Sequence, residues 1–222
     1  MKILVIDVGG TNIKLLSSGR RTPLKIPSGP DLTPGAMVSA VLEATADWTY
    51  EAVTIGYPGP VVKDRPTREP VNLGPGWVNF NYAKALKVPV KMINDAAMQA
   101  LGSYDGGVML FLGLGTGLGT TLVTHGTVVP LEIAHLPYRK DRTYEEYVGE
   151  AGLKQLGEKK WKKHVIDIVQ LFLDALNAEY AVLGGGNVRH FEDDLPPNTR
   201  RGSNMNAFRG GYRLWQKQAH LP

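Results

Sequence analysis

Three glycine-rich segments, each following an apolar run, are the parts of this sequence best suited to bind phosphate. They are Gly9, Gly10 and Thr11; Gly115, Thr116 and Gly117; and Gly184, Gly185 and Gly186. Such a turn at a strand end directs several backbone N–H groups the same way, and glycine permits positive φ values and close approach of a ligand. One turn of this kind is equally well explained as a tight hairpin. Three of them indicate a site for the phosphates and base of a nucleotide.

Two carboxylates also lie at the ends of apolar runs. Asp7 ends the first run, where it could hold Mg²⁺ beside bound phosphates or could only cap the turn. Asn94 and Asp95 follow the run 90–93. Asn and Asp are typical helix N-caps, and in an open α/β fold the same place suits a general base. The two roles are compatible, with Asn94 and Asp95 dividing them.

A third group of polar residues is suited to a sugar. Glu132 and His135 are three residues apart, and Glu145 lies downstream. Together they accept and donate hydrogen bonds, as the hydroxyls of a polyol require. As a metal site the group is weak, because the chain has no cysteine and only one histidine lies nearby. Isolated His and Glu pairs on loops are usually surface residues, so this interpretation needs other support.

The pattern of apolar residues and turns predicts alternating strands and helices. We expect strands at 2–8, 12–17, 22–26, 51–56, 90–93, 107–112, about 118–124 and 180–183. We expect helices at 34–48, near 80–87, from 94 to about 103, and at 143–156, 161–177 and 205–219. The segment 57–79 is rich in Pro, Gly and Asn and is expected to be a loop. The narrow polar stripe of the helix 161–177 predicts that it is largely buried.

An internal similarity relates the two halves of the chain. Residues 7–13 (DVGGTNI) resemble residues 112–118 (LGLGTGL), and Thr11 aligns with Thr116 at a spacing of 105 residues. Each copy begins one half of the sequence. The similarity predicts an α/β protein made of two similar lobes that face each other.

Composition excludes several classes of protein. Among 222 residues, 43% are hydrophobic and 21% are charged, which is typical of a folded globular protein rather than a disordered one. The absence of cysteine excludes a disulfide scaffold, a thiolate zinc site and a cysteine nucleophile. No apolar run is long enough to span a membrane, and the N-terminal segment lacks a signal-peptide pattern, so we expect a cytoplasmic protein.

The net charge of +4 leaves the choice of partner open. A mildly basic protein could bind nucleic acid, an anionic membrane or a phosphate-rich small molecule. Basic residues gather at 20–21, 159–163, 200–201 and at Arg209 and Arg213. Most such clusters are solvated surface, and the chain has no recognisable nucleic-acid-binding motif. We therefore expect neither nucleic acid nor membrane as a partner.

In their order and spacing, the motifs resemble those of the ROK family of sugar kinases. The segments are IDVGGTNIK, IGYPGPV, VNLGPGW, MINDAAMQALG, LGLGTGLGTTLV, the Glu132–His135 pair and VLGGG. They cover about residues 3–187, and the closing segment 206–214 (NAFRGGYRL) is similar to the closing helix of the family. The short length and the lack of cysteine resemble the polyphosphate glucokinase branch more than the zinc-bearing glucokinases.

The resemblance implies an actin-like, ribonuclease-H-like α/β fold with two lobes around a central cleft. Residues 1–104 would form the N-terminal lobe and 105–204 the C-terminal lobe, with the C-terminal helix 205–222 returning to the first. The implied activity is phosphoryl transfer to a sugar hydroxyl, most simply glucose to glucose 6-phosphate, a reaction of glycolysis. The implied donor is ATP or polyphosphate with Mg²⁺. Members of the family are often homodimers, so the resemblance also implies a homodimer.

The resemblance also assigns roles to individual residues. Asp95 matches the catalytic base of the family, and the residues that match its sugar-binding positions are Asn94, Glu132, His135 and Glu145. Asp7 would bind Mg²⁺ through water, the turns Gly9–Thr11 and Gly115–Gly117 would bind the donor phosphates, and Gly184–Gly186 would lie on the adenosine side. Glu145 is placed by its spacing to Gly149, and Glu146 is a rival for the same role.

The sequence departs from the family pattern at two places. The cysteine-rich zinc motif that many members carry after the histidine is replaced by PYRKDRTYEEYVG, so we expect no zinc. In the usual Glu-x-Gly-His motif, Ala134 replaces the glycine. Two alternatives stay open: a kinase for another acceptor, such as fructose or N-acetylmannosamine, and a non-catalytic sugar sensor, which would need neither Asp95 nor Asp7.

Overall fold

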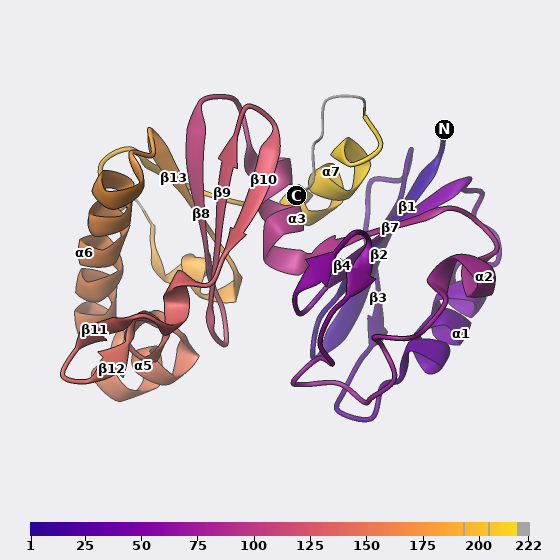
Figure 1. The fold of residues 1–222 in the computed structure, drawn as a ribbon, viewed down its shortest axis with the longest axis horizontal. Helices are drawn as coiled ribbons and strands as arrows, with labels where there is room; N and C mark the ends of the chain where they lie inside the picture. Colours follow the sequence, from indigo (N-terminus) through magenta and orange to yellow (C-terminus); the bar gives the residue numbers. More distant parts are fainter. Residues whose placement is uncertain (193, 204, 217–222) are drawn as a thin grey trace.

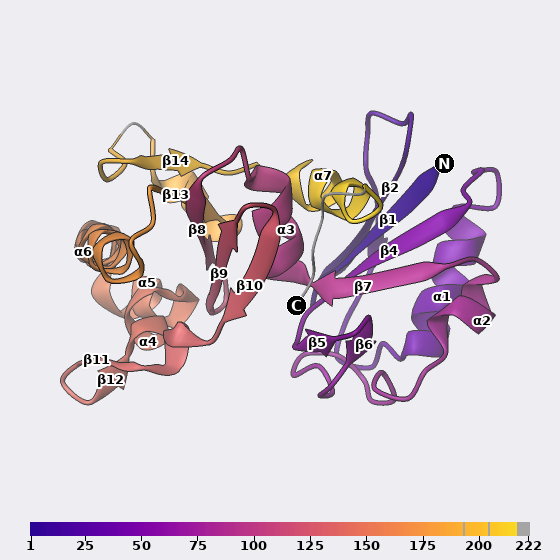
Figure 2. The same ribbon diagram turned by 45° about the horizontal axis from the view of Figure 1, so that its top comes forward.

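The protein consists of two lobes, each built on a five-stranded sheet, with two helices between them (Figures 1 and 2). The computed structural model describes residues 1–192, 194–203 and 205–216. Within these ranges no helix combines the length and the apolar character needed to cross a membrane. The α/β class and the two-lobed architecture predicted from the sequence are confirmed.

The first sheet brings the ends of three parallel strands to one edge. Its strands run in the order β3-β2-β1-β4-β7, and β1, β4 and β7 are parallel. Their bounds are β1 Ile3–Val8, β2 Asn12–Ser17, β3 Leu24–Pro27, β4 Ala52–Tyr57 and β7 Val90–Asn94. The helices α1 (Pro34–Ala44) and α2 (Tyr82–Leu86) lie on the outer face of this sheet (Figure 1). The central strands β1 and β4 are buried along their whole length, which explains their continuous apolar sequence.

The second sheet repeats this topology. Its order is β10-β9-β8-β13-β14, with an antiparallel meander of β8, β9 and β10 followed by two parallel strands. The bounds are β8 Val108–Leu114, β9 Leu118–Thr124, β10 Thr127–Leu131, β13 Tyr180–Gly184 and β14 Thr199–Arg201. The helices α4 (Tyr144–Val148), α5 (Glu150–Leu156) and α6 (Glu158–Leu176) lie on the outer side. Two short 3₁₀ helices, Ile133–His135 and Gly186–His190, and the small ribbon β11 (Pro137–Arg139) with β12 (Arg142–Thr143) complete the lobe.

The helices α3 (Asp95–Ser103) and α7 (Met205–Arg213) pack against each other between the two sheets (Figure 1). Their backbones approach so closely that a Cβ at Gly102 would overlap the carbonyl of Asn206. One apolar cluster includes Val5 of β1, Phe111 of β8 and Phe208 of α7, so it joins the two lobes. Since α7 also bonds to β4 through Thr54, whose hydroxyl donates to the Gly211 carbonyl at 2.8 Å, α7 is held against the first sheet.

Several elements differ from the sequence-based prediction. The expected loop 57–79 contains a small hairpin of β5 (Val61–Val62) and β6 (Arg65–Pro66), and β10 to β12 and β14 were not predicted. The expected helix 143–156 is two helices, because Gly149 adopts an extended conformation between them. The first predicted helix ends four residues early, at Ala44, and the end of the final helix was predicted beyond Arg213, partly in residues outside the described ranges.

The prediction that the helix within 161–177 is largely buried is wrong. The helix α6 begins at Glu158 and buries one face, which includes Trp161, Val165 and Phe172, while the side chain of Leu171 remains 45% exposed. The sequence pattern overestimated the width of the buried face of α6. Leu171 and the long charged side chains of the first turns lie on the side that faces solvent.

Candidate functional site

Asp95 lies at the N-terminus of α3, directly after β7. Asn94 is the N-cap: its Oδ1 accepts the Ala97 N–H at 3.0 Å, and its Nδ2 donates to the Gly59 carbonyl at 3.1 Å. Asp95 Oδ1 accepts the Ala96 N–H at 2.8 Å. The N-cap interpretation of Asn94 is therefore confirmed. The cap holds the first turn of α3, and with it the Asp95 carboxylate, at the edge where the parallel strands end.

Asp7 lies at the same edge, on β1. Its side chain is buried and forms an ion pair with Lys14, with 3.1 Å between Oδ2 and Nζ. The two residues face each other across the β1–β2 hairpin. On the other side, Asp7 is in register with Gly56 of β4, where a Cβ would come within 3.7 Å of Asp7 Oδ1. The glycine thus leaves space over β4 into which the carboxylate extends.

The environment of Asp95 destabilises its ionised form. Burial is the main cause, and the nearby charge of Asp7 adds to it; together they raise the pKa of Asp95 from 3.8 to about 7. The Ala96 N–H and the charge of Lys14 act in the opposite direction and limit the rise. Asp95 is therefore a carboxylate that gains and loses a proton near neutral pH, as a general base requires.

The first glycine turn connects β1 and β2. The Gly9 N–H donates to the Asn12 carbonyl at 3.1 Å, and a Cβ at Gly9 would lie 2.9 Å from that oxygen. Gly10 and Thr11 are exposed. Neither glycine adopts a positive φ. At this turn, glycine serves close approach of the backbone rather than a left-handed conformation, and an exposed surface is left in front of Gly10 and Thr11.

The second glycine turn connects β8 and β9 and carries Glu145 beside it. Glu145 Oε2 accepts the Leu118 N–H at 2.9 Å, and a Cβ at Gly117 would overlap the same carboxylate. Glu146 points elsewhere: it accepts the Thr143 N–H at 2.7 Å and completes a capping box at the start of α4. Of the two rivals, only Glu145 adjoins the glycine turn.

The third glycine segment packs directly on the second turn. Gly185 has a φ of +80°, and a Cβ there would overlap the Leu114 carbonyl. Asn187 is buried, and its Nδ2 donates to the Gly115 carbonyl at 3.1 Å. The structure therefore brings Gly184–Gly186 and Gly115–Gly117 together, as a shared nucleotide site would require.

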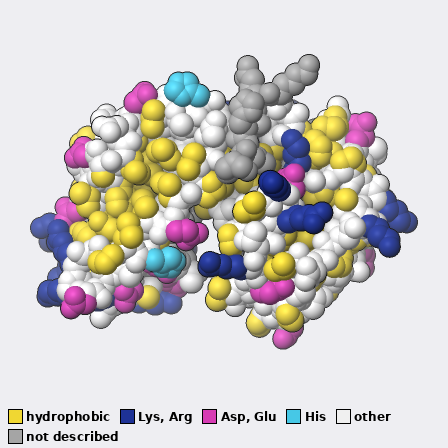
Figure 3. All heavy atoms as spheres, viewed as in Figure 1, with side chains coloured by type: hydrophobic (Ala, Val, Ile, Leu, Met, Phe, Trp, Pro, Cys, Tyr) yellow, Lys and Arg dark blue, Asp and Glu magenta, His cyan; other side chains and the backbone are white. Residues whose placement is uncertain are grey.

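The two lobes meet at α3. A Cβ at Gly119 of β9 would lie 2.9 Å from the Ala96 Cβ, so the first turn of α3 touches the strand that follows the second glycine turn. A cavity of about 80 Å³ lies at the same boundary, and its lining includes Asn94 of β7 and Pro130 of β10. Figure 3 shows the surface hollowed along the line between the lobes, with charged side chains on both rims. Asp95, in the first turn of α3, thus lies between Asp7 of the first sheet and strand β9 of the second lobe.

Glu132 and His135 are the least constrained of the predicted residues. They lie at the 3₁₀ helix after β10, with 3.8 Å between Glu132 Oε2 and His135 Nε2, and their side chains are 81% and 65% exposed. In the described part of the chain, no hydrogen bond or ion pair joins them to Asp95 or Asn94. The structure places them on the second lobe as free donors and acceptors.

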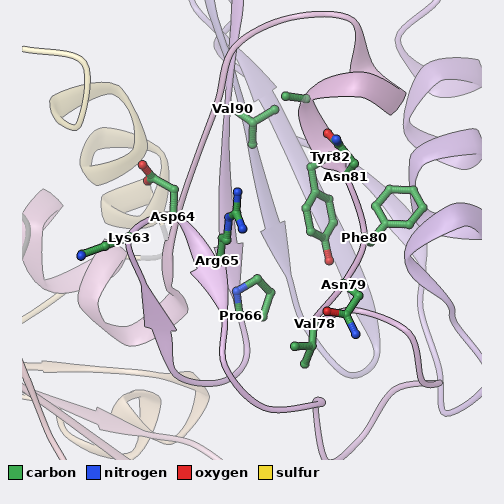
Figure 4. A pocket seen from close by; sticks show the side chains of 11 residues that line it. Lys63, Asp64, Arg65, Pro66, Val78, Asn79, Phe80, Asn81, Tyr82 and Val90 are labelled. Carbon is green, nitrogen blue, oxygen red and sulfur yellow. The ribbon is translucent and has the colours of Figure 1, made fainter.

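A second cavity, of about 430 Å³, contains none of the predicted site residues. It lies on the first lobe between the β5–β6 hairpin and the segment leading into α2 (Figure 4). Lys63 and Asp64 lie on one rim, and Tyr82 lies on the other. Its lining includes neither a glycine turn nor a carboxylate at the end of a parallel strand.

Comparisons with known proteins agree with this geometry. No protein-family model matches the chain. The polyphosphate glucokinase of Mycobacterium tuberculosis (strain H37Rv) is 25% identical over 214 residues, which cover 86% of this chain and 80% of the relative. The inorganic polyphosphate/ATP-glucomannokinase of Arthrobacter sp. strain KM superposes with a TM-score of 0.78 at 21% identity, covering 95% of this chain and 96% of the other. The ROK hexokinase of Thermus thermophilus superposes with a TM-score of 0.70 at 22% identity, with the same coverage.

The chain has the fold of the ROK sugar kinases. The resemblance predicted from the sequence is thereby confirmed. Within this ROK fold, sequence reasoning missed two polar residues of the site, Lys14 and Asn187. Lys14 could have been found, because a tight turn at residues 9–11 places it opposite Asp7 in the hairpin. Asn187 gave no such signal, since its partner, the Gly115 carbonyl, is distant in sequence.

Proposed function

We propose that this protein is a sugar kinase that transfers a phosphoryl group from ATP or polyphosphate to the 6-hydroxyl of glucose. The observation that carries the proposal is the environment of Asp95. Its carboxylate has a pKa of about 7, lies next to the Asp7–Lys14 pair, and is attached to the helix that contacts both lobes.

Asp95 acts as the general base. It orients the sugar hydroxyl and accepts its proton as that oxygen attacks the terminal phosphorus of the donor; the bond from this phosphorus to the bridging oxygen breaks, and ADP or the shortened polyphosphate leaves. A pKa near 7 makes the carboxylate basic enough to take the proton, while about half of it is ionised at neutral pH. A positioned base of this kind contributes ~10²–10⁴-fold to the rate.

The glycine turns hold the donor, with Lys14 close by. Exposed backbone at Gly10, Thr11 and Thr116 offers N–H groups to phosphate oxygens. Lys14 neutralises part of the acidic pair and adds positive charge near the first turn. The set of groups fits phosphoryl transfer, in which the protein mainly positions the reactants and stabilises charge.

The residues at this edge also fit Mg²⁺. The ion is usually bound by one or two carboxylates together with substrate phosphates and waters. Asp7 and Asp95 supply two carboxylates that repel each other, which a cation would relieve. Within the described ranges, no group of three or more acidic or histidine side chains is close enough to hold a metal alone. When bound with the donor, Mg²⁺ supplies charge neutralisation at the phosphates.

The sugar lies against Asn94 and Glu145, with Glu132 and His135 contributing from the 3₁₀ helix after β10. Glu145 is held beside the second glycine turn by the Leu118 N–H, whereas the Glu146 carboxylate is engaged in the cap of α4. This supports Glu145 rather than Glu146 as the sugar-binding residue. His135 and Glu132 reach the sugar when the lobes, residues 1–104 and 105–204, close on it and exclude water.

The choice of glucose and of donor follows the relatives. The mycobacterial relative is named a polyphosphate glucokinase, and the Arthrobacter protein a polyphosphate/ATP-glucomannokinase. We extend both donors to this chain and place its activity in the cytoplasm. We include a homodimer as part of the proposal.

A coupled assay tests the proposal. Purified protein with Mg²⁺ is given glucose, mannose, fructose or N-acetylmannosamine, each with ATP or polyphosphate, and sugar phosphate is measured. We expect the highest kcat/KM with glucose, and we expect Asp95→Asn to lower kcat at least 100-fold. The exposed Asp31→Asn is the matched control. Sugar binding without any phosphorylated product would identify a sensor and overturn the kinase assignment; a preference for another sugar would overturn the choice of glucose.

A further inference from the structure

A hollow of about 170 Å³ lies on the side of the molecule where β14 meets the C-terminal end of α3 and the first turns of α7. Three arginines line it, Arg200 and Arg201 from β14 and Arg209 from α7. Asp105 is the one acidic side chain among its described lining residues. The hollow therefore has an excess of two positive charges.

One of these arginines is explained by the fold. Arg200 Nη1 pairs with Asp105 Oδ2 at 2.6 Å, and its Nη2 donates to the Ser103 carbonyl at 2.6 Å. The guanidinium thus caps the C-terminal end of α3, where positive charge is favourable. Arg201 and Arg209 are exposed, belong to the lining of the same hollow and take no part in this cap. The cap of α3 therefore does not account for these two arginines.

Two buried polar side chains in the lining of the hollow are hydrogen-bonded to each other. Ser103 and Asn206 are both buried, and Asn206 Nδ2 donates to Ser103 Oγ at 2.8 Å. Here arginines from two elements belong to the lining of one concavity, which also includes the buried Ser103 and Asn206. Guanidinium groups bind phosphate oxygens through paired, charge-assisted hydrogen bonds.

The hollow is separate from the catalytic edge. Asp95 begins α3 and Ser103 ends it, and at 1.5 Å per residue the two ends are about 12 Å apart. We propose that the hollow formed by Arg200, Arg201 and Arg209 is a second anion site that binds inorganic phosphate or a short condensed phosphate. An anion there joins β14 of the second lobe to α7, which packs on the first sheet. The arginine site stands whether or not the protein is a kinase, and only the count of two equivalents used below rests on the donor site of the proposed function.

Calorimetric titration with tripolyphosphate at constant ionic strength tests the site. We expect two equivalents to bind, one at the glycine turns and one at the arginine hollow. The double variant R201Q/R209Q should lose one equivalent, or bind it at least tenfold more weakly for each arginine removed, and should keep the other. The matched control R21Q/K25Q removes two positive charges from exposed positions around β3 and should keep both equivalents.

Two further measurements sharpen the result. The variant R201K/R209K keeps the charge but loses the planar donors, and it should bind more weakly than the natural protein if guanidinium geometry matters. Repeating the titration with orthophosphate shows whether one phosphate group suffices. Equal binding by R201Q/R209Q and R21Q/K25Q would overturn the proposal. So would a second equivalent that NaCl abolishes equally in both variants, because that would be nonspecific charge attraction.

Discussion

Replacing Asp95 by asparagine should make the protein more stable at neutral and alkaline pH while removing its proposed activity. The ionised carboxylate is disfavoured in the folded protein by burial and by the charge of Asp7. In the unfolded chain the same group is solvated and ionises easily. An asparagine has no charge to desolvate, and its Oδ1 can still accept the Ala96 N–H that Asp95 Oδ1 accepts now.

The size of the effect follows from the two pKa values. Raising the pKa of Asp95 from 3.8 to about 7 corresponds to roughly 4 kcal/mol of lost stability once the group is ionised in both states. The loss disappears well below pH 3.8, where the carboxyl is protonated in both states. It grows as the pH rises, because the unfolded state ionises first, and it levels off above about pH 7. At pH 5 it is about 2 kcal/mol.

Urea unfolding of the natural protein and of D95N at pH 3.5, 5 and 8 measures this difference. We expect the variant to gain up to about 4 kcal/mol at pH 8, which is about 8–16 °C in Tm for a chain of this size, and almost nothing at pH 3.5. The exposed Asp31→Asn should change stability by less than about 0.5 kcal/mol at every pH. If D95N is folded but no more stable than the natural protein at pH 8, the carboxylate is not destabilised by the fold, and its assignment as a base with a pKa near 7 is wrong.

Three other predictions concern the charge near the base, the sugar-binding glutamate and the lobe junction. The kcat/KM of the natural protein should fall as the pH drops below about 7. Lys14→Met should move this fall to higher pH, because the charge of Lys14 lowers the pKa of Asp95. If the pH at which kcat/KM is half-maximal stays the same in this variant, Lys14 does not have that role. Glu145→Gln should raise the KM for the sugar at least tenfold with little change in Tm. Glu146→Ala, which removes the side chain that completes the capping box, should lower the Tm and leave KM unchanged; the reverse pattern would assign the sugar contact to Glu146. Gly102→Ala should destabilise the protein by about 1–3 kcal/mol or more in urea unfolding, because the added Cβ overlaps α7, while Gly29→Ala, which has open space, should not.

Several features of the site could be predicted because they are local in sequence. A glycine turn follows an apolar run within a few residues, and an Asn-Asp pair before a helical pattern indicates a cap. The structure confirms that Asn94 is an N-cap. It also confirms that each of the three glycine segments lies at the end of a strand. The repeated strand–turn–strand pattern was sufficient to predict two similar lobes, because each copy contains its own apolar strands and its own glycine turn.

Other features could not be predicted because they depend on residues far apart in the chain. The pKa of Asp95 depends on Asp7 and Lys14, which reach it only because β4 lies between β1 and β7 in the sheet. Glu145 and Glu146 are neighbours with the same chemistry, and only the packing of α4 against the second glycine turn separates their contacts.

The sequence by itself determined most strands of the two large sheets, their glycine turns and the kinds of chemical group available, since these follow from local backbone preferences and apolar periodicity. The tertiary structure alone decided which groups meet: the acidic pair beside its lysine, the third glycine segment against the second, and the arginines of β14 beside that of α7. The physical reason is that electrostatic interactions and exclusion of water depend on distance in space, and distance in space is set by the packing of two sheets around α3 and α7.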